Sequence, residues 1–304
     1  MSRRHELDGR LHSLEDIGKI MRSMKNLSYM ETRKLARFLE SQPRVVDSIE
    51  AAAEDFLAGY PDLLPAAPGQ GILYLLIGAE RGFCGNFNEA VRDALGRENT
   101  GDAPDATLLI AVGNRLAMLL DGDPRLVAMI TGASAAEEVP AVLGRMIQPL
   151  QRLTTERGIG TLCVIHWDPD AEQVLCDPLL PPFRALPPDA GAARPFPPRL
   201  NLAPEAFLTA LIEHYLFAGL HALLFGSLMA EHQQRVRHLE GALQRVDSRA
   251  GELRQRRNVL RQEEITEEIE LILLNLPPPA EGRAGDEAGL DARGGGPGTG
   301  TVSS

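Results

Sequence analysis

Residues Val236 to Leu260 read VRHLEGALQRVDSRAGELRQRRNVL and carry the most regular apolar spacing in the chain. Its apolar residues recur at alternating steps of three and four, the a/d pattern of a coiled coil: Val236, Leu239, Leu243, Val246, Ala250, Leu253 and Leu260, interrupted by Arg257. A helix with such a seam needs a partner helix. The other extended helical pattern lies at the opposite end of the chain, where the recurring apolar residues are Leu7, Leu11, Leu14, Ile17, Met21, Met24 and Leu27. The two terminal segments are therefore predicted to pair as one rod.

Composition and charge narrow the class of protein. A chain of 304 residues that is 44% hydrophobic has room for a sizeable core, and its net charge of −11 disfavours nucleic acid as a partner. The positive charge gathers at the amino-terminal helix, which is predicted to be a basic rod within an acidic protein. It comprises Arg3, Arg4, Arg10, Lys19, Arg22, Lys25, Arg33, Lys34 and Arg37.

The cysteines and the apolar segments bear on the compartment. Cys84, Cys163 and Cys176 form no CxxC pair and are odd in number, so we expect reduced thiols and neither a disulfide framework nor a zinc site. The first residues lead into an amphipathic pattern, so no secretory signal is expected. The stretch from Tyr215 to Ala230 is shorter than the ~20 residues that span a bilayer and is better interpreted as a buried helix. A cytoplasmic location is expected.

The chain between the two terminal patterns alternates short apolar runs with helical patterns. The predicted strands are 72–77, 107–112, 126–130 and 161–167, and the predicted helices between them are 87–97, 114–120 and 135–157. This order is typical of a mostly parallel, doubly wound, Rossmann-like α/β domain.

Proline and glycine mark the boundaries of the predicted regions. Pro43 is expected to end a first helix that starts near Ser2, with a continuation over 44–58. Pro178 to Pro204 carries nine prolines in 27 residues, which predicts an extended strap without regular structure. The predicted organisation is a coiled-coil helix (1–58), a central α/β domain (70–180), a Pro-rich connector (181–204), a second coiled-coil helix (205–276) and a disordered tail (277–304).

The loop Gly78-Ala-Glu-Arg-Gly-Phe-Cys-Gly-Asn-Phe-Asn88 follows the first predicted strand and opens a helix. One interpretation is a phosphate or dinucleotide loop, which would make the chain a nucleotide-binding enzyme with a coiled-coil arm for oligomerisation. However, neither GxGxxG nor GxxxxGK[ST] is present, so a tight glycine turn that shapes a contact surface is favoured. Cys84 could be a nucleophile at a helix amino terminus, but no histidine or aspartate pairs with it in the sequence, and a structural role is favoured. No cofactor and no metal are predicted.

Carboxylates cluster in Gln262-Glu-Glu-Ile-Thr-Glu-Glu-Ile-Glu270, just after four arginines, Arg254, Arg256, Arg257 and Arg261. The simpler interpretation is a solvated acidic face on a helix with an apolar stripe. The alternative is a docking surface whose charges grip a surrounding protein.

Three motifs in order resemble the gamma subunit of rotary F-type ATP synthases. ELDGRLHSLEDIGKIMRSM, from Glu6 to Met24, is similar to the family's opening helix, I-x-S-x-x-N-T-x-K-I-T-x-A-M. RGFCGNFN, from Arg81 to Asn88, is similar to R-G-L-C-G-G-x-N, and RQEEITEEI, from Arg261 to Ile269, is similar to R-Q-x-x-I-T-x-E-I. The resemblance spans residues 6 to 276.

The resemblance implies a non-catalytic central rotor stalk that couples ion flow to ATP synthesis or hydrolysis. In it the terminal helices form an antiparallel coiled coil inside a ring of alpha and beta subunits, and catalysis lies on the beta subunits. The α/β domain would meet the epsilon subunit and the membrane rotor ring, at the cytoplasmic face of a bacterial inner membrane. Carried over by motif, the residues expected to contact the ring are Met24, Lys25, Arg81, Cys84, Arg235, Arg261, Gln262, Thr266 and Glu268.

The sequence also departs from the family pattern. Asp16 and Ile17 replace the usual Asn-Thr, Asn86 stands where glycine is common, and the tail extends beyond the usual end. These departures fit a divergent, alternate branch of bacterial ATPases. The resemblance implies that the ion is selected in the membrane ring, so this chain does not distinguish protons from sodium.

Overall fold

The computed structural model describes residues 3–40, 42–63, 69, 71–98, 107–183 and 199–275. The chain divides into two units, Met1–Arg254 and Gln255–Ser304. Helix α6 (Pro204–Leu274) contributes to both. The predicted tail and residues 184–198 of the predicted connector lie outside the described residues.

A five-stranded sheet forms the centre of the first unit, in the order β3-β2-β1-β4-β5. Its strands are β1 (Gly71–Ile77), β2 (Thr107–Val112), β3 (Leu126–Ile130), β4 (Ile159–Asp168) and β5 (Gln173–Leu180). The first four are parallel, and β5 runs antiparallel to β4. The connecting helices are α3 (Phe87–Glu98), α4 (Asn114–Leu119) and α5 (Val139–Arg157), with a 3-10 turn, η3 (Ala136–Glu138), before α5. The prediction of a mostly parallel α/β domain is confirmed.

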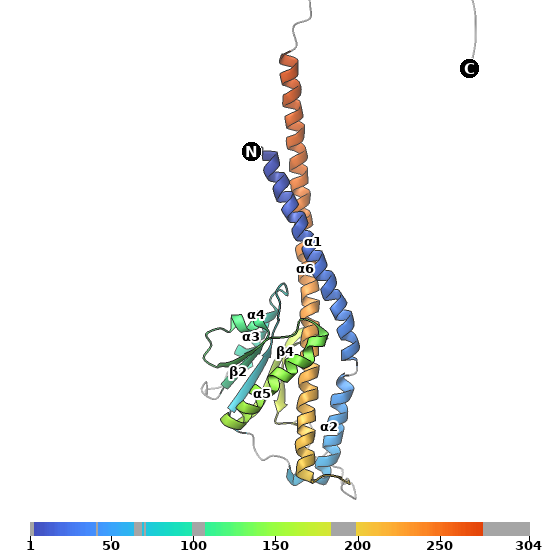
Figure 1. Ribbon diagram of the computed structural model, residues 1–304, viewed down its shortest axis with the longest axis vertical. Helices are drawn as coiled ribbons and strands as arrows, with labels where there is room; N and C mark the ends of the chain where they lie inside the picture. The colour runs from blue at the N-terminus through green and yellow to red at the C-terminus, as the bar shows by residue number, and fades with distance from the viewer. Residues whose placement is uncertain are drawn as a thin grey trace, which may run out of the picture. The chain divides into compact units, whose positions relative to one another are not determined.

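The two faces of the sheet bury different helices, as the alternation of side chains along β1 requires. Leu73, Leu75 and Ile77 pack with residues of α5 and α6. Tyr74 and Leu76 face the opposite way and pack with residues of α3 and α4. Figure 1 shows the sheet with α5 and α6 on one side and α3 and α4 on the other. The sheet is therefore buried on both faces, which explains why its central strands are continuous apolar runs.

Strand β5 is not among the predicted strands, and the predicted irregular segment begins within it, at Pro178. In the structure Pro178 lies within β5, opposite Cys163 of β4. Since β5 has a neighbour on one side only, a residue without an N–H group can occupy it. The prediction of irregular structure was wrong for residues 178–180.

The amino-terminal helices lie along α6. They are α1 (Arg3–Leu39) and α2 (Gln42–Gly59), close to the predicted bounds. Leu11 packs with Ala250 and Leu253, and Met21 packs with Leu239 and Leu243. Nearer its end, α1 stacks Phe38 on Phe225 at 5.1 Å between ring centroids. Residues later in α1 contact residues earlier in α6, so the two helices are antiparallel.

The predicted seam on α6 is confirmed from Leu239 to Leu253, but the seam on α1 takes a different register. Leu239, Leu243, Ala250 and Leu253 of α6 are buried. On α1 the predicted seam residues Ile17 and Leu27 are 48% and 65% exposed, and their neighbours Gly18 and Ser28 are buried instead. A heptad seam alternates steps of four and three residues, so the step of three from Leu11 to Leu14 is followed by a step of four to Gly18. A second step of three leads to Ile17, which lies roughly 100° around the helix from Gly18.

A smaller apolar cluster joins α2 to the start of α6. It consists of the buried residues Ala53, Phe56, Phe183, Leu208 and Leu211. Helix α6 is long and apolar enough by length and composition alone to cross a membrane. Its residues Leu220, Leu224 and Phe225, however, are buried in the core beneath the sheet, which is the environment expected of a core helix.

Candidate functional site

The loop from Gly78 to Asn88 connects the carboxyl end of β1 to α3 and is held by the loops that follow the neighbouring strands. Ala79 N donates to Asn88 Oδ1 at 2.8 Å. The Glu80 carboxylate accepts hydrogen bonds from the backbone N of Asn114 at 3.0 Å, after β2, and of Gly132 at 2.8 Å, after β3. Glu80 also accepts from the side-chain amide of Asn114. One carboxylate thus ties together the ends of three parallel strands.

Two glycines allow the close approach that this arrangement needs. A Cβ on Gly78 would lie 2.3 Å from Cβ of Leu116, on α4. Gly113 has φ 102°, and a Cβ there would lie 2.6 Å from the carbonyl oxygen of Gly78. Any side chain at either position would push the first turn of α4 away from the loop. The glycines serve tight packing of protein on protein.

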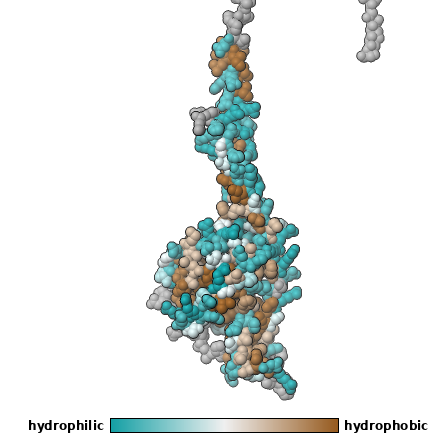
Figure 2. All heavy atoms as spheres, in the orientation of Figure 1, coloured by the Kyte–Doolittle hydropathy of each residue, from teal (hydrophilic) through white to brown (hydrophobic). Residues whose placement is uncertain are grey.

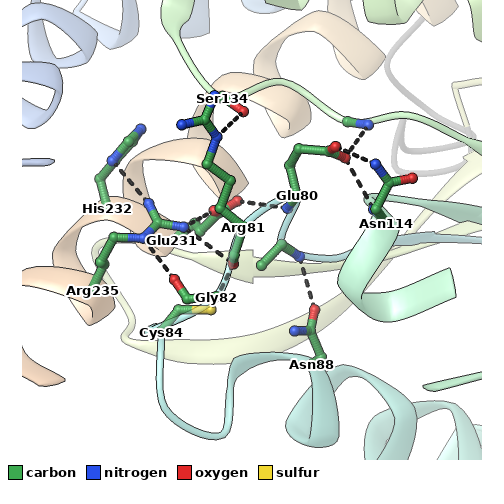
Figure 3. Close-up of polar contacts among 12 residues, drawn as sticks. Glu80, Arg81, Gly82, Cys84, Asn88, Asn114, Ser134, Glu231, His232 and Arg235 are labelled. Carbon is green, nitrogen blue, oxygen red and sulfur yellow. Dashed lines mark hydrogen bonds and ion pairs between the residues drawn. The ribbon is translucent and has the colours of Figure 1, made fainter. Parts of the chain in front are cut away.

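Helix α6 meets this loop with a buried ion pair. Glu231 and Arg235, one helical turn apart, are 3% and 5% exposed, and their carboxylate and guanidinium are in direct contact. Arg235 Nε donates to the carbonyl of Gly82 at 3.0 Å, and its Nη2 donates to the carbonyl of Arg81 at 3.3 Å. Glu231 accepts from the backbone N of Glu80 at 3.4 Å. Figure 3 shows the pair reaching across from α6 to consecutive residues of the loop.

Burial governs the electrostatics of this cluster. Burial raises the pKa of Glu231, and the charge of Arg235 opposes that shift. Burial lowers the pKa of His232 to about 4, with the charge of Arg235 acting in the same direction. His232 is therefore neutral at neutral pH. Its Nδ1 accepts from Arg235 Nη1 at 3.2 Å, which leaves the proton on Nε2, a buried atom for which the described residues provide no hydrogen-bond partner.

Cys84 belongs to the same loop but lacks the character of a nucleophile. Its thiol donates to the carbonyl of Arg81 at 3.4 Å, and burial raises its pKa to about 11. A thiol in this state is protonated at neutral pH and unreactive. The structural interpretation of Cys84 is supported. Within residues 3–275, wherever the structure describes them, no three His, Cys, Asp or Glu side chains gather in a way that could hold a metal ion.

In this strand order a nucleotide would bind at the switch point between β1 and β4, beyond their carboxyl ends. Helix α6 occupies that place. Glu231 and Arg235 bond to the loop after β1, Ala230 packs in the same cluster as Trp167 at the end of β4, and Gly226 approaches Pro169. The position where a Rossmann-like enzyme holds its cofactor is therefore used to join the sheet to the long helix.

Comparison with known proteins agrees with this architecture. A family profile described as ATP synthase matches residues 3–273. The chain belongs to the ATP synthase gamma-chain family. An "ATP synthase gamma chain" from Clostridium botulinum strain Hall is 24% identical over 274 residues, which cover 87% of this chain and 94% of that protein.

Solved structures of low sequence identity share the fold. The rotor of the Euglena gracilis mitochondrial ATP synthase gives a TM-score of 0.56 at 15% identity, covering 86% of this chain and 98% of that one. The central stalk and c-ring structure of the Tetrahymena thermophila mitochondrial enzyme gives a TM-score of 0.52 at 17% identity, covering 73% and 99%. The predicted identification with the gamma subunit, and with it the role of a central stalk subunit, is confirmed.

The residues expected at the interface with the ring fall into three groups in this gamma-family chain. Arg81 is exposed, and the four residues on α6 beyond the first unit, Arg261, Gln262, Thr266 and Glu268, are exposed as well. Met24 and Lys25 are half-buried beside α6, where Met24 packs near Leu239 and Lys25 lies 3.5 Å from Glu240. Cys84 and Arg235 are buried within the chain itself.

Sequence reasoning missed the partners of Arg235. Glu80, Glu231 and His232 were not singled out, although a glutamate and an arginine four residues apart in an apolar stretch are a recognisable signal of an ion pair. The role of Glu80 leaves no such signal, because its partners follow strands that are distant in sequence.

Proposed function

We propose that the chain works as the central rotor stalk within a ring of alpha and beta subunits, with catalysis on the beta subunits. The observation that carries the proposal is the antiparallel pairing of the two ends of the chain, α1 and α6, beside an α/β domain whose ligand crevice is filled by α6. Such a chain offers surfaces for partners instead of a catalytic pocket. An asymmetric shaft touches each catalytic site of a ring differently and so biases the sites among different states in turn.

A second apolar stripe on α1 supports a surrounding partner. Ile17, Ile20, Leu27 and Met30 are all exposed, and the first three recur at heptad-related steps on a side of α1 turned away from α6. Exposed apolar stripes of this kind are typical of protein contact surfaces. In the proposal this stripe lies against the inner wall of the ring.

The described end of α6, in the second unit, offers a further apolar surface. Ile265, Ile269, Ile272 and Leu274 are exposed there. Figure 2 shows this end as a brown region next to the atoms drawn in grey. We assign it, together with Arg261, Gln262, Thr266 and Glu268, to contact with the ring. Arg81, Met24 and Lys25 remain in the proposed interface, whereas we assign Cys84 and Arg235 to holding the loop behind it.

The remaining partners follow from the same role. The α/β domain is proposed to meet the epsilon subunit and the membrane rotor ring, at the cytoplasmic face of a bacterial inner membrane. In this scheme residues 1–58 and 205–276 form the shaft, 70–180 form the domain, 181–204 connect them, and 277–304 form a tail.

The test is mass spectrometry of the intact complex purified from membranes through a tag on this chain. We expect alpha and beta subunits to appear with it in a defined stoichiometry. Isolation of a stable, coupled alpha-beta assembly that lacks this chain would contradict the proposal.

A further inference from the structure

Two of the three cysteines lie side by side on one face of the sheet. Cys163 is on β4, and Cys176 is on the antiparallel strand β5. Cys163 pairs with Pro178 and Cys176 pairs with Ile165, so the two cysteines are diagonal neighbours across the strands. Both side chains pack on the face of the sheet that α3 covers, and their thiols share a hydrogen bond. We call Cys163 and Cys176 the strand dithiol.

The strand dithiol is accessible to small solutes. Cys163 and Cys176 are each half-buried, unlike Cys84, which is buried in the loop after β1. On β1, Tyr74 pairs with Cys163 and is itself buried, so it borders the two thiols on their inner side. Glu98, the last residue of α3, is exposed, and its charge acts on both Tyr74 and Cys176. A cation that approaches from solvent therefore meets two sulfur atoms with a carboxylate nearby.

The surroundings of the strand dithiol disfavour the thiolate form as long as no cation is bound. The hydrogen bond with Cys163 raises the pKa of Cys176, burial acts in the same direction, and so do the negative charges of Glu98 and Asp177. A thiol that stays protonated is a poor nucleophile and is oxidised slowly. The same negative charges favour a bound cation, because a cation that replaces the thiol protons gives each sulfur a positive neighbour.

The spacing of the strand dithiol suits a bridging ion better than a disulfide. The Cα atoms of diagonal neighbours on antiparallel strands are roughly 7–8 Å apart. A disulfide usually needs Cα atoms about 4.4–6.8 Å apart, so the strands would have to shift before the two sulfurs could bond to each other. Two sulfurs on one tetrahedral zinc ion, with Zn–S bonds of about 2.3 Å, lie about 3.8 Å apart. That separation is close to the separation of two sulfurs that share a hydrogen bond.

We propose that the strand dithiol binds one thiophilic divalent cation, of the class of Zn²⁺ and Cd²⁺, through both sulfur atoms. Binding breaks two S–H bonds, forms two metal–sulfur bonds and releases two protons to solvent, so the net charge of the site is unchanged. The described residues gather no third His, Cys, Asp or Glu ligand around an ion, so water completes the coordination. The bound ion joins the edge strand β5 to β4. This site is independent of the proposed stalk role.

The experiment titrates the reduced full-length chain with Cd²⁺ under an inert atmosphere. The ultraviolet charge-transfer absorption of cadmium thiolates reports binding to sulfur, native mass spectrometry counts the bound ions, and competition gives the affinity for Zn²⁺. Cys163→Ala and Cys176→Ala each remove one of the two sulfurs. Cys84→Ala is the matched control, because it removes the remaining thiol, which lies in the loop after β1. Thermal unfolding of each chain is recorded with and without the metal.

We expect the unmodified chain and Cys84→Ala to bind one Cd²⁺ with equal affinity and with the thiolate absorption. Losing a residue that only orients a metal ligand costs about 10–100-fold in affinity, so Cys163→Ala and Cys176→Ala should each weaken binding by about tenfold or more. Because two protons leave for each ion bound, the affinity should rise by up to about a hundredfold per pH unit while both thiols are protonated. Cd²⁺ should also raise the unfolding temperature of the unmodified chain, since the folded chain holds the two sulfurs together.

Several outcomes would overturn the inference. Equal binding by the unmodified chain and both strand variants would show an adventitious ion only, and weakened binding in just one of them would show a single-thiol contact. An affinity that stays constant between about pH 6 and pH 7.5 would place the ion on carboxylates, which are ionised throughout that range. The pH series needs only the unmodified chain, so it decides the matter even if a variant folds poorly. None of these outcomes bears on the stalk role, which co-purification with alpha and beta subunits tests separately.

Discussion

Replacing Arg235 with methionine should destabilise the chain in a way that depends strongly on pH. The substitution keeps an unbranched apolar stem but removes the guanidinium, which is the counter-charge of the 3% exposed Glu231. The abandoned carboxylate must then either stay ionised without its partner or take up a proton. At about pH 7.5, protonating a glutamate whose ordinary pKa is 4.5 costs about 4 kcal/mol, and this bounds the loss from that group. Breaking a buried pair in other proteins costs a similar ~3–5 kcal/mol.

The double variant Glu231→Leu with Arg235→Met removes both charges and should recover much of that loss. It still removes the Arg235 donors from both loop carbonyls: the Arg81 carbonyl keeps the Cys84 thiol, whereas the loss at the Gly82 carbonyl costs about 1–3 kcal/mol if that carbonyl stays buried. Apart from the long bond from the backbone N of Glu80 at 3.4 Å, which only the double variant loses, the difference in stability between the two variants reports the stranded carboxylate. In the single variant the folded-state pKa of Glu231 lies above its unfolded value. The difference in free energy of unfolding between the single and double variants should therefore vanish below about pH 4.5 and grow as pH rises.

The assay is urea unfolding of the full-length chain between about pH 5 and pH 8, followed by far-ultraviolet circular dichroism. Both variants share any change at His232, so its titration cancels in the comparison. A single variant that loses less than about 1 kcal/mol at neutral pH, or a difference between the two variants that does not grow with pH, would refute the reasoning that the pair is buried and mutually dependent.

Three further predictions concern other parts of the chain. The pKa of His232 in the folded chain is about 4, below its ordinary 6.5, so its protonation favours the unfolded chain. The free energy of unfolding should therefore fall by up to about 3 kcal/mol as pH drops from about 6.5 to 4. His232→Gln, measured by the same unfolding assay, should lose that part of the acid sensitivity. Leu243→Ala in the α6 seam should lower the free energy of unfolding of the free chain by about 2–5 kcal/mol. Ile17→Asp on the exposed stripe should change it by less than about 1 kcal/mol but should impair co-purification with the ring. Equal losses of stability in the two variants would contradict the observed seam. Arg261→Glu should reduce coupled ATP synthesis in membranes while the free chain keeps its helical circular dichroism, and unchanged coupling would remove Arg261 from the interface.

Much of the fold could be predicted because its signals are periodic and local. The α6 seam repeats over several heptads, so a single exception such as Arg257 does not obscure it. Strands β1, β2 and β4 are continuous apolar runs between helical patterns, as expected of strands buried on both faces of a sheet. The edge strand β3 also carries an apolar run, although Val127 and Met129 on it are exposed. Strand β5 lacked that signal, because an edge strand needs neither a full set of N–H donors nor a continuous apolar run.

The register of α1 was harder to predict for a physical reason. The chain carries apolar residues on two stripes of this helix, one against α6 and one exposed, and the sequence does not distinguish them. At Gly18 and Ser28 the seam uses small residues, which allow close approach but carry no apolar signal. The pattern of apolar residues alone therefore selects Ile17 and Leu27, which belong to the exposed stripe.

The candidate site was predictable only in outline. The glycine-rich loop could be recognised, together with its place after a strand. The identity of its partner could not, since the contact between Arg235 and Gly82 joins residues 153 positions apart. The same distance in sequence hides the convergence of Asn114 and Gly132 on Glu80.

The contacts along α6 suggest why a buried ion pair is added to the apolar packing that joins the domain to this helix. Apolar packing is non-directional and tolerates small sliding and rotation of one helix on another. Between Leu228 and Leu239, α6 instead buries Glu231, His232 and Arg235. Hydrogen bonds from a guanidinium to two successive carbonyls hold only at one angle, so they set the rotation of α6 about its own axis relative to the sheet. Replacing them with apolar side chains should preserve association but loosen that angle, and in a rotating stalk a loosened angle would appear as lost coupling before lost assembly.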